Sequence, residues 1–221
     1  MKRDLALHAT TLLLAGTLGG VLLTQAACKR SGPDIKIGVI AELSGDIPAV
    51  GDSCKKAAEL AISEINESGG VKVAGTHHLL RLLIEDGQGK GDASVAAAQR
   101  LIDQEGVIAV IGPNASSGAV PAAAVAEEKK TLLVSPWSTA PRLTRDDGDK
   151  MRRFVYRVCY SDEFQARSLA KFATGYIKAT KLAILFNTES EAPKAQAELM
   201  KKEFESRGGQ VVAMETYAAG T

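Results

Sequence analysis

The sequence predicts an α/β protein built on a mostly parallel sheet that helices cover on both faces. Two observations support this fold class. Short runs rich in β-branched residues alternate with longer segments whose apolar residues recur at helical spacing. Clusters of Gly, Pro, Asp and Ser separate those segments. Parallel strands need such helical crossovers, and the crossovers are right-handed. The 221 residues suffice for one large domain, or for one domain and part of another.

Strands are expected wherever a short apolar run rich in β-branched residues lies between turn residues. The first, residues 35–43, reads IKIGVIAEL and leads the predicted sheet. The remaining strands are expected at residues 79–84, 107–111, 131–134, 153–158, 181–186 and 210–217. Parallel sheets bind ligands at the carboxyl ends of their strands. That rule selects four loops: residues 44–52, 86–91, 113–117 and 136–141.

Four of the expected helices start at residues that can cap a helix N-terminus. These residues are Asp52-Ser53, Asp92, Ser116-Ser117 and Ser161 or Asp162. The first helix ends at Gly69-Gly70, and the third is rich in alanine and runs to Lys129. The fourth has a clear amphipathic face, formed by Leu169, Phe172, Ala173, Tyr176 and Ile177. A last helix around Met200 ends at Gly208-Gly209.

The second half of the predicted fold is incomplete within these residues. A new strand–helix–strand unit begins near Thr180, and the sequence stops at Thr221 after its second strand. Two parallel strands and one helix cannot bury a core of their own, and a second lobe of ordinary size needs roughly 100–150 residues. We expect an N-terminal lobe over residues 35–158. Residues 159–221 are expected to form a hinge crossing and an incomplete, C-terminally truncated second lobe.

The N-terminus has the order of a secretory signal. Lys2 and Arg3 precede an apolar stretch from Leu12 to Leu23, and small residues follow. A membrane-spanning helix is the alternative, but a span needs ~20 predominantly apolar residues, and this stretch is shorter and rich in glycine. We therefore predict a signal peptide over residues 1–27 and a polar tether over residues 28–34.

Ala26-Ala27-Cys28 resembles the end of a bacterial lipobox, in which the cysteine thiol is acylated and becomes the new N-terminus. That motif prefers an aliphatic residue where this chain has Gln25. Two outcomes stay open. Either the protein is anchored to the membrane by a lipid on Cys28, or ordinary cleavage near Ala27 releases a free periplasmic protein.

Composition and cysteine usage exclude several functional classes. The chain is 45% hydrophobic and 24% charged, with 27 basic and 26 acidic residues. Removal of residues 1–27 leaves 25 of each sign, so a nucleic-acid binder is not expected. Cys54 and Cys159 remain besides Cys28. An exported protein can oxidise such a pair, and two buried thiols are the alternative. The sequence has no CxxC, so neither a redox site nor a metal site is predicted.

The segment GPNASS, residues 112–117, joins a predicted strand to a helix N-terminus. Backbone N–H groups are unpaired there and the helix dipole favours an anion, so a carboxylate suits the site. Ser116 and Ser117 add hydroxyl donors beside Asn114. The alternative is that either serine only caps the helix.

The segment SPWSTAP, residues 135–141, follows the next strand and should lie beside that helix start. Ser138 and Thr139 can donate hydrogen bonds to a polar ligand and accept them from it. Trp137 forms either an apolar wall of the pocket or part of the core, and both readings stay open.

An ordered set of runs covers residues 35–221: IKIGVIAELSG, AISEINESGGV, IEDGQG, VIAVIGPNASS, VSPWSTAPRLT and YRVCYSDEFQA. This set resembles the branched-chain amino-acid-binding (Leu/Ile/Val-binding-like) family of ABC transporter substrate-binding proteins. The resemblance implies a type I periplasmic-binding fold with one Rossmann-like lobe and the start of a second. It implies an extracytoplasmic receptor that closes two lobes around an amino acid of branched-chain type or a related small carboxylate or amide. An ABC permease is then the partner, and no cofactor and no reaction are expected.

The resemblance also implies roles for particular residues. The α-carboxylate of the ligand would sit on Ser116 and on the loop with Ser138 and Thr139, where Thr139 also meets the α-ammonium group. Tyr160 and Asp162 fall at the first crossing between lobes, where family members line the cleft. In the family, an acidic residue and an aromatic residue of the second lobe complete the site at positions after Thr221.

Three departures from the family pattern leave the ligand open. Val50 stands where the family often has an aromatic residue that covers the ligand side chain. Trp137 replaces a small residue of the binding loop. Gln88 and Ala115 occupy the positions that form a disulfide in some members, so that bridge is absent.

The same kind of fold serves two other function classes, enzymes and sensor domains. An enzyme lacks support because the chain has no G-x-S-x-G and no GxGxxG after the first strand. Its three histidines are His8 in the predicted signal peptide and His77-His78 in an expected loop. A ligand-sensing domain of a signalling receptor uses the same fold, and these residues do not distinguish it from a transport receptor.

Overall fold

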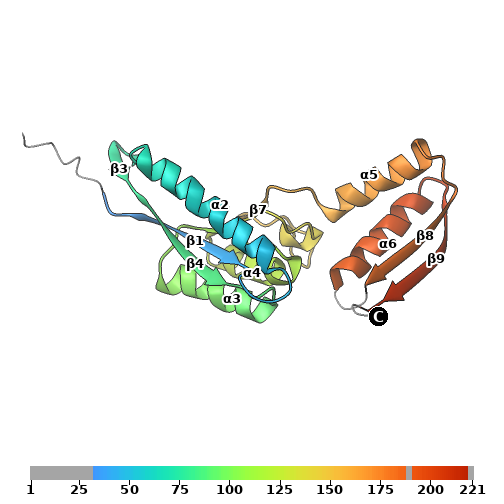
Figure 1. Ribbon diagram of the computed structural model, residues 1–221, viewed down its shortest axis with the longest axis horizontal. Coiled ribbons are helices and arrows are strands. Elements are labelled where there is room, and N and C mark those ends of the chain that lie inside the picture. The colour runs from blue at the N-terminus through green and yellow to red at the C-terminus, as the bar shows by residue number, and fades with distance from the viewer. Residues whose placement is uncertain (1–31, 188–190, 219–221) are drawn as a thin grey trace, which may run out of the picture.

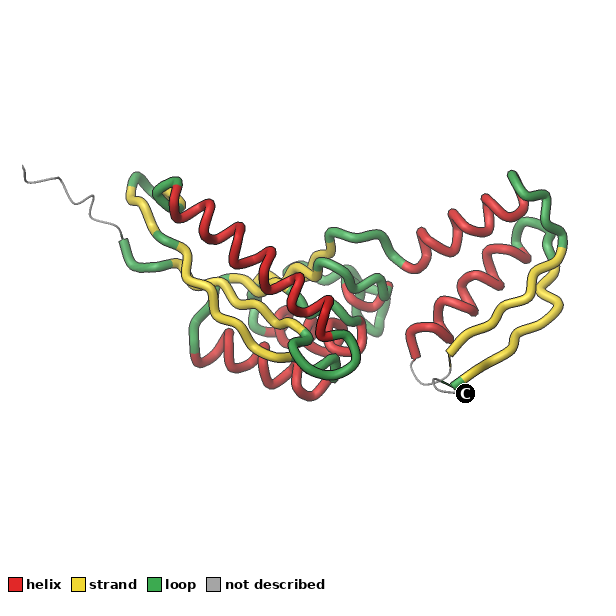
Figure 2. The backbone as a smooth tube through the Cα atoms, in the orientation of Figure 1, coloured by secondary structure: helices red, strands yellow, loops and turns green. Residues whose placement is uncertain are grey.

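The computed structural model describes residues 32–187 and 191–218. The predicted signal peptide and Cys28 therefore lie outside the described residues. Figure 1 shows two units joined by a single crossing: a five-stranded unit over residues 32–158 and a two-stranded unit that starts at residue 162. The tube in Figure 2 shows strands lying between helices in the five-stranded unit. None of the helices in the described part of the chain is long and apolar enough to cross a membrane.

The five-stranded unit contains one parallel sheet with the order β4-β1-β5-β6-β7. Its strands are β1 (Ile35–Ala41), β4 (Leu80–Asp86), β5 (Ala109–Ile111), β6 (Leu132–Ser135) and β7 (Val155–Arg157). Val39 of β1 lies opposite Ile84 on one side and Ile111 on the other. The strand order reverses at β1, and sheets of this kind bind ligands outside the carboxyl ends of the strands at such a switch point. The predicted parallel α/β sheet is confirmed.

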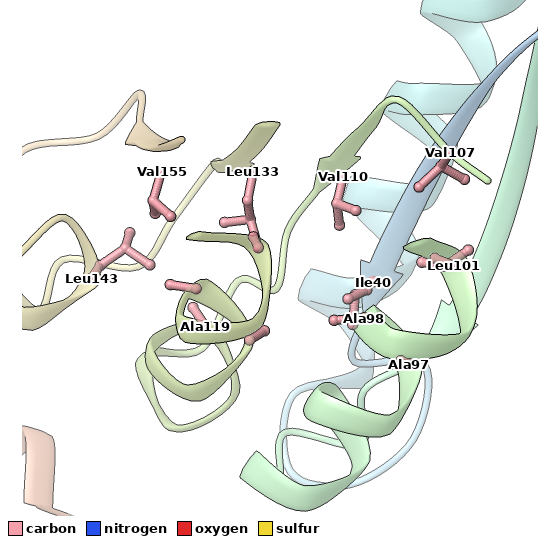
Figure 3. Close-up of a cluster of buried hydrophobic side chains, with 13 residues drawn as sticks. Ile40, Ala97, Ala98, Leu101, Val107, Val110, Ala119, Leu133, Leu143 and Val155 are labelled. Atoms are coloured by element: carbon pink, nitrogen blue, oxygen red, sulfur yellow. The ribbon is translucent and has the colours of Figure 1, made fainter. Parts of the chain in front are cut away.

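Helices cover the sheet on both faces. One face carries α3 (Gly91–Gln99), which continues as a π-helical turn over Arg100–Gln104, and α4 (Ser116–Glu128). The other carries α2 (Pro48–Glu67). Successive residues of β1 serve opposite faces because strand side chains alternate: Ile40 packs in the α3–α4 cluster, and Val39 packs against α2. Figure 3 shows Ile40, Val110, Leu133 and Val155 on the strands facing the alanines of the helices.

Small residues let the helices approach the sheet closely. The helix side of the larger core is built mainly from alanines: Ala97, Ala98, Ala119, Ala122, Ala123 and Ala126. Leu101 and Leu133 belong to the same core and are fully buried, which stabilises the fold by roughly 1.5–3 kcal/mol each. In α2, a Cβ on Gly51 would overlap the carbonyl oxygen of Glu42, so only glycine permits this contact.

The first helix begins earlier than its predicted cap at Asp52-Ser53. α2 starts at Pro48, and Ile47 is the N-cap without a side-chain hydrogen bond. Proline suits the first helical position because its φ angle is already helical and its missing N–H would have no partner there. Asp52 lies inside the helix instead and pairs with Lys56 one turn later, with 2.6 Å between Oδ2 and Nζ.

His77-His78 were expected in a loop, but they lie in a hairpin strand. β2 (Val71–Val73) and β3 (Thr76–His78) pair antiparallel, with Val73 opposite Thr76. The two residues of the turn have φ angles of 48° at Ala74 and 88° at Gly75, as two-residue hairpins require. The sequence signal was weak because alanine seldom adopts a positive φ.

The two-stranded unit consists of α5 (Asp162–Gly175), β8 (Lys181–Asn187), α6 (Glu191–Glu205) and β9 (Gln210–Tyr217). β8 and β9 are parallel, and α5 packs along α6. The predicted start of α5 is confirmed, because Ser161 Oγ accepts from the Phe164 N–H at 3.3 Å. The predicted apolar face of this helix is not buried, however: Leu169 is 49% and Phe172 is 51% exposed. Tyr176 and Ile177, which were predicted on the same face, lie beyond the end of the helix at Gly175. A sheet of two strands is too narrow to cover that face.

Candidate functional site

The loop from β5 to α4, residues 112–115, lies at the switch point of the sheet. α4 begins at Ser116 as predicted, but Ala115 is the N-cap, so neither serine caps the helix. The two hydroxyls have different partners. Ser116 Oγ lies 2.9 Å from Ser138 Oγ, whereas Ser117 Oγ donates to the carbonyl oxygen of Gly89 at 2.8 Å.

A buried carboxylate that the sequence analysis did not single out holds this loop. Glu42 follows β1 and is 0% exposed. Its Oε1 accepts from the backbone N–H groups of Asn114 (3.0 Å) and Ala115 (2.9 Å), and its Oε2 accepts from Asn114 Nδ2 (2.7 Å). The negative charge sits at the N-terminal end of α4, where the helix dipole stabilises it. The sequence shows only that an acidic residue directly follows a mostly apolar strand, which does not reveal its partners.

Ser135 ties the second predicted loop to the first. Its Oγ donates to the carbonyl oxygen of Pro113 (2.6 Å) and accepts from the N–H of Ser138 (3.1 Å). The SPWSTAP loop therefore lies beside the start of α4, as predicted. Ser138 is buried within this arrangement, and its hydroxyl is shared with Ser116.

The far side of that loop is held by β7 and by the crossing after it. The carbonyl oxygen of Ser138 accepts from Arg157 Nη1 (3.2 Å) and from Cys159 Sγ (3.3 Å). The carbonyl oxygen of Thr139 accepts from the backbone N–H of Asp162 (2.9 Å). Desolvation lowers the pKa of the Arg157 guanidinium, which stays charged at any physiological pH.

Side chains from both units meet in a pocket of about 240 Å³. Its lining consists of Asn114, Ala115, Ser116, Trp137, Thr139, Tyr160, Gln165 and Gln196. Trp137 is 51% exposed, so it is a wall of the pocket and not part of the core. Gln165 of α5 and Gln196 of α6 were not predicted, because no motif distinguishes a single glutamine on a helix.

Four other predicted residues do not line the pocket. The Ser117 hydroxyl is hydrogen-bonded to Gly89, and the Ser138 hydroxyl is hydrogen-bonded to Ser116. Val50 lies in the first turn of α2. Asp162 is only 3% exposed, and its Oδ1 accepts from Gln196 Nε2 at 2.7 Å. Its carboxylate therefore acts behind the pocket, by holding a side chain that lines it.

The two remaining candidate loops bind each other. Asp86 Oδ1 accepts from the N–H groups of Leu43 (3.0 Å), Ser44 (3.3 Å) and Gln88 (2.9 Å), and Oδ2 accepts from Ser44 Oγ (2.6 Å). Desolvation alone would raise the pKa of this carboxyl group. The hydrogen bonds from Ser44, Gln88 and Leu43 outweigh it and lower the pKa below its ordinary value.

Cys54 and Cys159 are free thiols, each partly buried, and desolvation raises the pKa of both. They form no disulfide, which agrees with the thiol alternative. No group of His, Cys, Asp and Glu side chains within the described ranges is placed to hold a metal ion.

The family follows from comparison with known proteins. The sequence pattern of the periplasmic binding proteins matches residues 34–221. The chain belongs to this periplasmic binding protein family. This periplasmic binding protein is 34% identical over 175 residues to a Leu/Ile/Val-binding protein of Rhizobium johnstonii, across 79% of this chain and 45% of that protein. It is 36% identical over 152 residues to a Leu/Ile/Val-binding protein homolog of Brucella melitensis, and the match covers 69% of this chain and 39% of that protein.

Solved structures of periplasmic binding proteins share the fold. The TM-score is 0.72 with the branched-chain amino acid transporter substrate-binding protein of Streptococcus pneumoniae in complex with isoleucine, at 28% identity over 85% of this chain and 51% of that one. The TM-score is 0.70 with a leucine-binding protein of Thermotoga maritima, which is 29% identical and matches over 85% of this chain and 50% of that one. The predicted type I periplasmic-binding fold and the resemblance to the Leu/Ile/Val-binding family are confirmed. The chain spans about half the length of the proteins it matches.

Proposed function

We propose that this chain belongs to an extracytoplasmic receptor of an ABC transporter that captures an amino acid, or a related small carboxylate or amide, between two lobes. One observation carries the proposal: Ser116 and Thr139 of the five-stranded unit share a pocket with Gln165 and Gln196 of the other unit. Residues 35–158 of the five-stranded unit then form the first ligand-binding lobe. Residues 159–221 supply the crossing and the start of the second lobe. The permease of the transporter is the proposed partner.

The chemistry of the pocket suits the carboxylate of an amino acid. The first two backbone N–H groups of α4, those of Ser116 and Ser117, have no acceptor within the helix. The Ser116 hydroxyl and the Thr139 hydroxyl lie beside them as further donors. Binding needs no reaction, and we propose that the protein is a receptor and not an enzyme. The names of the relatives also describe binding.

We further propose that the protein is exported by a signal peptide over residues 1–27 and held at the membrane by a lipid on Cys28. The charged, apolar and small-residue segments before Cys28 support export. A lipid-anchored receptor stays close to its permease, which suits a protein that must deliver its ligand there.

Thermal unfolding of the complete mature gene product, measured against a panel of amino acids, amides and small carboxylates, tests the receptor function. A ligand that binds only the folded state adds about 2.7 kcal/mol of stability at a concentration of 100 times its Kd. We expect a clear rise in Tm with one class of amino acid. A well-folded sample whose Tm responds to no member of the panel contradicts the proposal.

Variants at the two hydroxyls test the site. A hydrogen bond to a charged group contributes about 1.5–3 kcal/mol, so Ser116→Ala and Thr139→Ala should each raise the Kd of the ligand about tenfold or more. Ser117→Ala is the matched control, because the Ser117 hydroxyl adjoins Ser116 in sequence but donates to Gly89 outside the pocket. Equal affinities in Ser116→Ala, Thr139→Ala and the control would refute the assignment.

A further inference from the structure

We infer that the end of the five-stranded unit at which the tether enters lies against the membrane surface and touches the lipid through an apolar patch. The patch consists of Pro33, Ile35, Val73 and Ile108. The inference rests on the proposed lipid anchor at Cys28 and adds the surface of the protein that meets the membrane. It follows from where the chain is fixed, how far Cys28 can reach, and which side chains are exposed there.

The hairpin of β2 and β3 fixes the first described residues of the chain. The Gly32 N–H donates to the carbonyl oxygen of His77 at 2.8 Å, and the carbonyl oxygen of Pro33 lies 2.8 Å from His78 Nδ1. A Cβ on Gly32 would overlap the His78 imidazole, so glycine permits this close approach. The hairpin therefore sets the point at which the tether leaves the folded unit.

The tether is too short to let this end of the unit move far from the anchor. Cys28 is four residues before Gly32. An extended chain spans at most about 3.3–3.6 Å per residue, so the two Cα atoms lie within about 14 Å of each other. The hairpin and the start of β1 lie at the end of the molecule away from α5 (Figure 1). A lipid on Cys28 therefore brings the N-terminal ends of β1 and β4 to the bilayer.

The surface beside this point is apolar and exposed. An open hollow of about 370 Å³ lies there, lined by the four residues of the patch and by Asp34, Lys36, Gly106 and His78. Ile108 is 62% exposed and Val73 is 48% exposed, although both are aliphatic. Contiguous exposed apolar side chains mark a contact with a membrane or with another protein. The tether selects the membrane, because it holds these side chains within reach of the bilayer.

The charges around the patch suit an anionic lipid surface. Lys29 and Arg30 belong to the tether, and Lys72 is an exposed residue of the hairpin. Among the described residues that line the hollow, Asp34 is the one acidic side chain, and Lys36 opposes it in charge. A surface that combines basic and apolar residues binds at the membrane interface through its buried apolar area and through attraction to anionic lipids.

Fluorescence quenching tests this inference on the complete, lipid-modified gene product in vesicles. The vesicles contain phosphatidylcholine and phosphatidylglycerol, with or without bromine on the acyl chains. Val73→Trp and Ile108→Trp place a tryptophan in the patch. Leu60→Trp is the matched control, because Leu60 is also exposed and aliphatic but lies in α2, about 10 Å along the helix from its end at Glu67. The wild type supplies the background from Trp137, the one tryptophan of the sequence.

Bromine quenches a tryptophan that it touches, so quenching reports contact with the acyl chains. We expect quenching in Val73→Trp and Ile108→Trp to be about twofold stronger, or more, than in Leu60→Trp. Equal quenching in the three variants, in vesicles that retain the protein, overturns the inference. Equal quenching together with a dimer of the lipid-free mature protein in sedimentation, which Ile108→Asp dissociates, assigns the patch to a second copy and overturns the inference as well.

Flotation of the vesicles separates this inference from the anchor on which it rests. Wild-type protein that does not float with the vesicles overturns both the anchor at Cys28 and the inference. Protein that floats but shows equal quenching overturns the inference alone. Thermal unfolding with ligands measures the receptor function independently, and neither outcome alters it.

Discussion

Glu42→Leu is the substitution that most directly tests how the binding loop is held. In the wild type, one buried carboxylate accepts three hydrogen bonds: from the backbone N–H groups of Asn114 and Ala115 and from the Asn114 amide. Leucine has a similar volume and is compatible with the apolar strand before it, so the substitution mainly removes the acceptors. The donors, which lie at the start of α4, would then be buried without partners.

The magnitude follows from the number of donors. Each buried donor left unpaired costs about 1–3 kcal/mol. Removal of the carboxylate also removes the cost of burying its charge, which offsets part of that loss. We expect Glu42→Leu to reduce the free energy of unfolding by about 3–6 kcal/mol. Glu42→Gln keeps one acceptor oxygen, and rotation of the Asn114 amide can present its oxygen to the new NH₂ group, so we expect a loss of about 1 kcal/mol.

Urea unfolding of the complete mature protein, followed by circular dichroism, measures these losses. Glu64→Leu is the control, because Glu64 is an exposed glutamate of α2. The order of stabilities should be wild type and control, then Glu42→Gln, then Glu42→Leu. A loss below about 1 kcal/mol in Glu42→Leu would show that water or loop movement satisfies the donors, and that Glu42 does not hold the loop.

Two further predictions concern the loop at Asp86 and the anchor at Cys28. The folded state lowers the pKa of Asp86, so its contribution to stability is present above the ordinary pKa of aspartate and is lost as the pH falls through the lower folded value. The Tm of the wild type should therefore decrease as the pH is lowered below about 4, and the Tm of Asp86→Asn should decrease less steeply. Equal dependence of Tm on pH in the two proteins would refute the role of Asp86 in stabilising the loop. Cys28→Ser should abolish metabolic labelling with a radioactive fatty acid, and persistent labelling would contradict lipidation at Cys28.

The elements around the first half of the site could be predicted because their signals are local. Gly112 follows an apolar strand, and Ser116 begins an alanine-rich helix. The spacing of apolar residues and the turn residues between these elements therefore locate the loop. The position of that loop beside Ser138 follows from the parallel order of consecutive strands. Local signals misplaced the start of α2 because Asp52 and Pro48 both mark helix starts, and the sequence alone did not rank them.

The residues that complete the site depend on contacts between distant segments. Glu42 is 72 residues from its partner Asn114, and Gln196 is 34 residues from Asp162. Nothing in the immediate sequence of a glutamate after a strand, or of a glutamine on a helix, indicates such a partner. Trp137 was left between wall and core for the same reason, because its exposure depends on which elements pack over it.

Asp162 connects the binding loop to the second unit through two different groups. Its backbone N–H binds the carbonyl oxygen of Thr139, and its carboxylate binds Gln196 of α6. Asp162 and Gln196 both lie in the second unit, so motion of the two units relative to each other must either break the hydrogen bond from the Asp162 N–H to the Thr139 carbonyl oxygen or carry the Thr139 loop along. Each of these changes alters the pocket, so a ligand that touches both Thr139 and Gln196 has different affinities for the two arrangements. That difference in affinity is the physical requirement for a ligand to shift a conformational equilibrium.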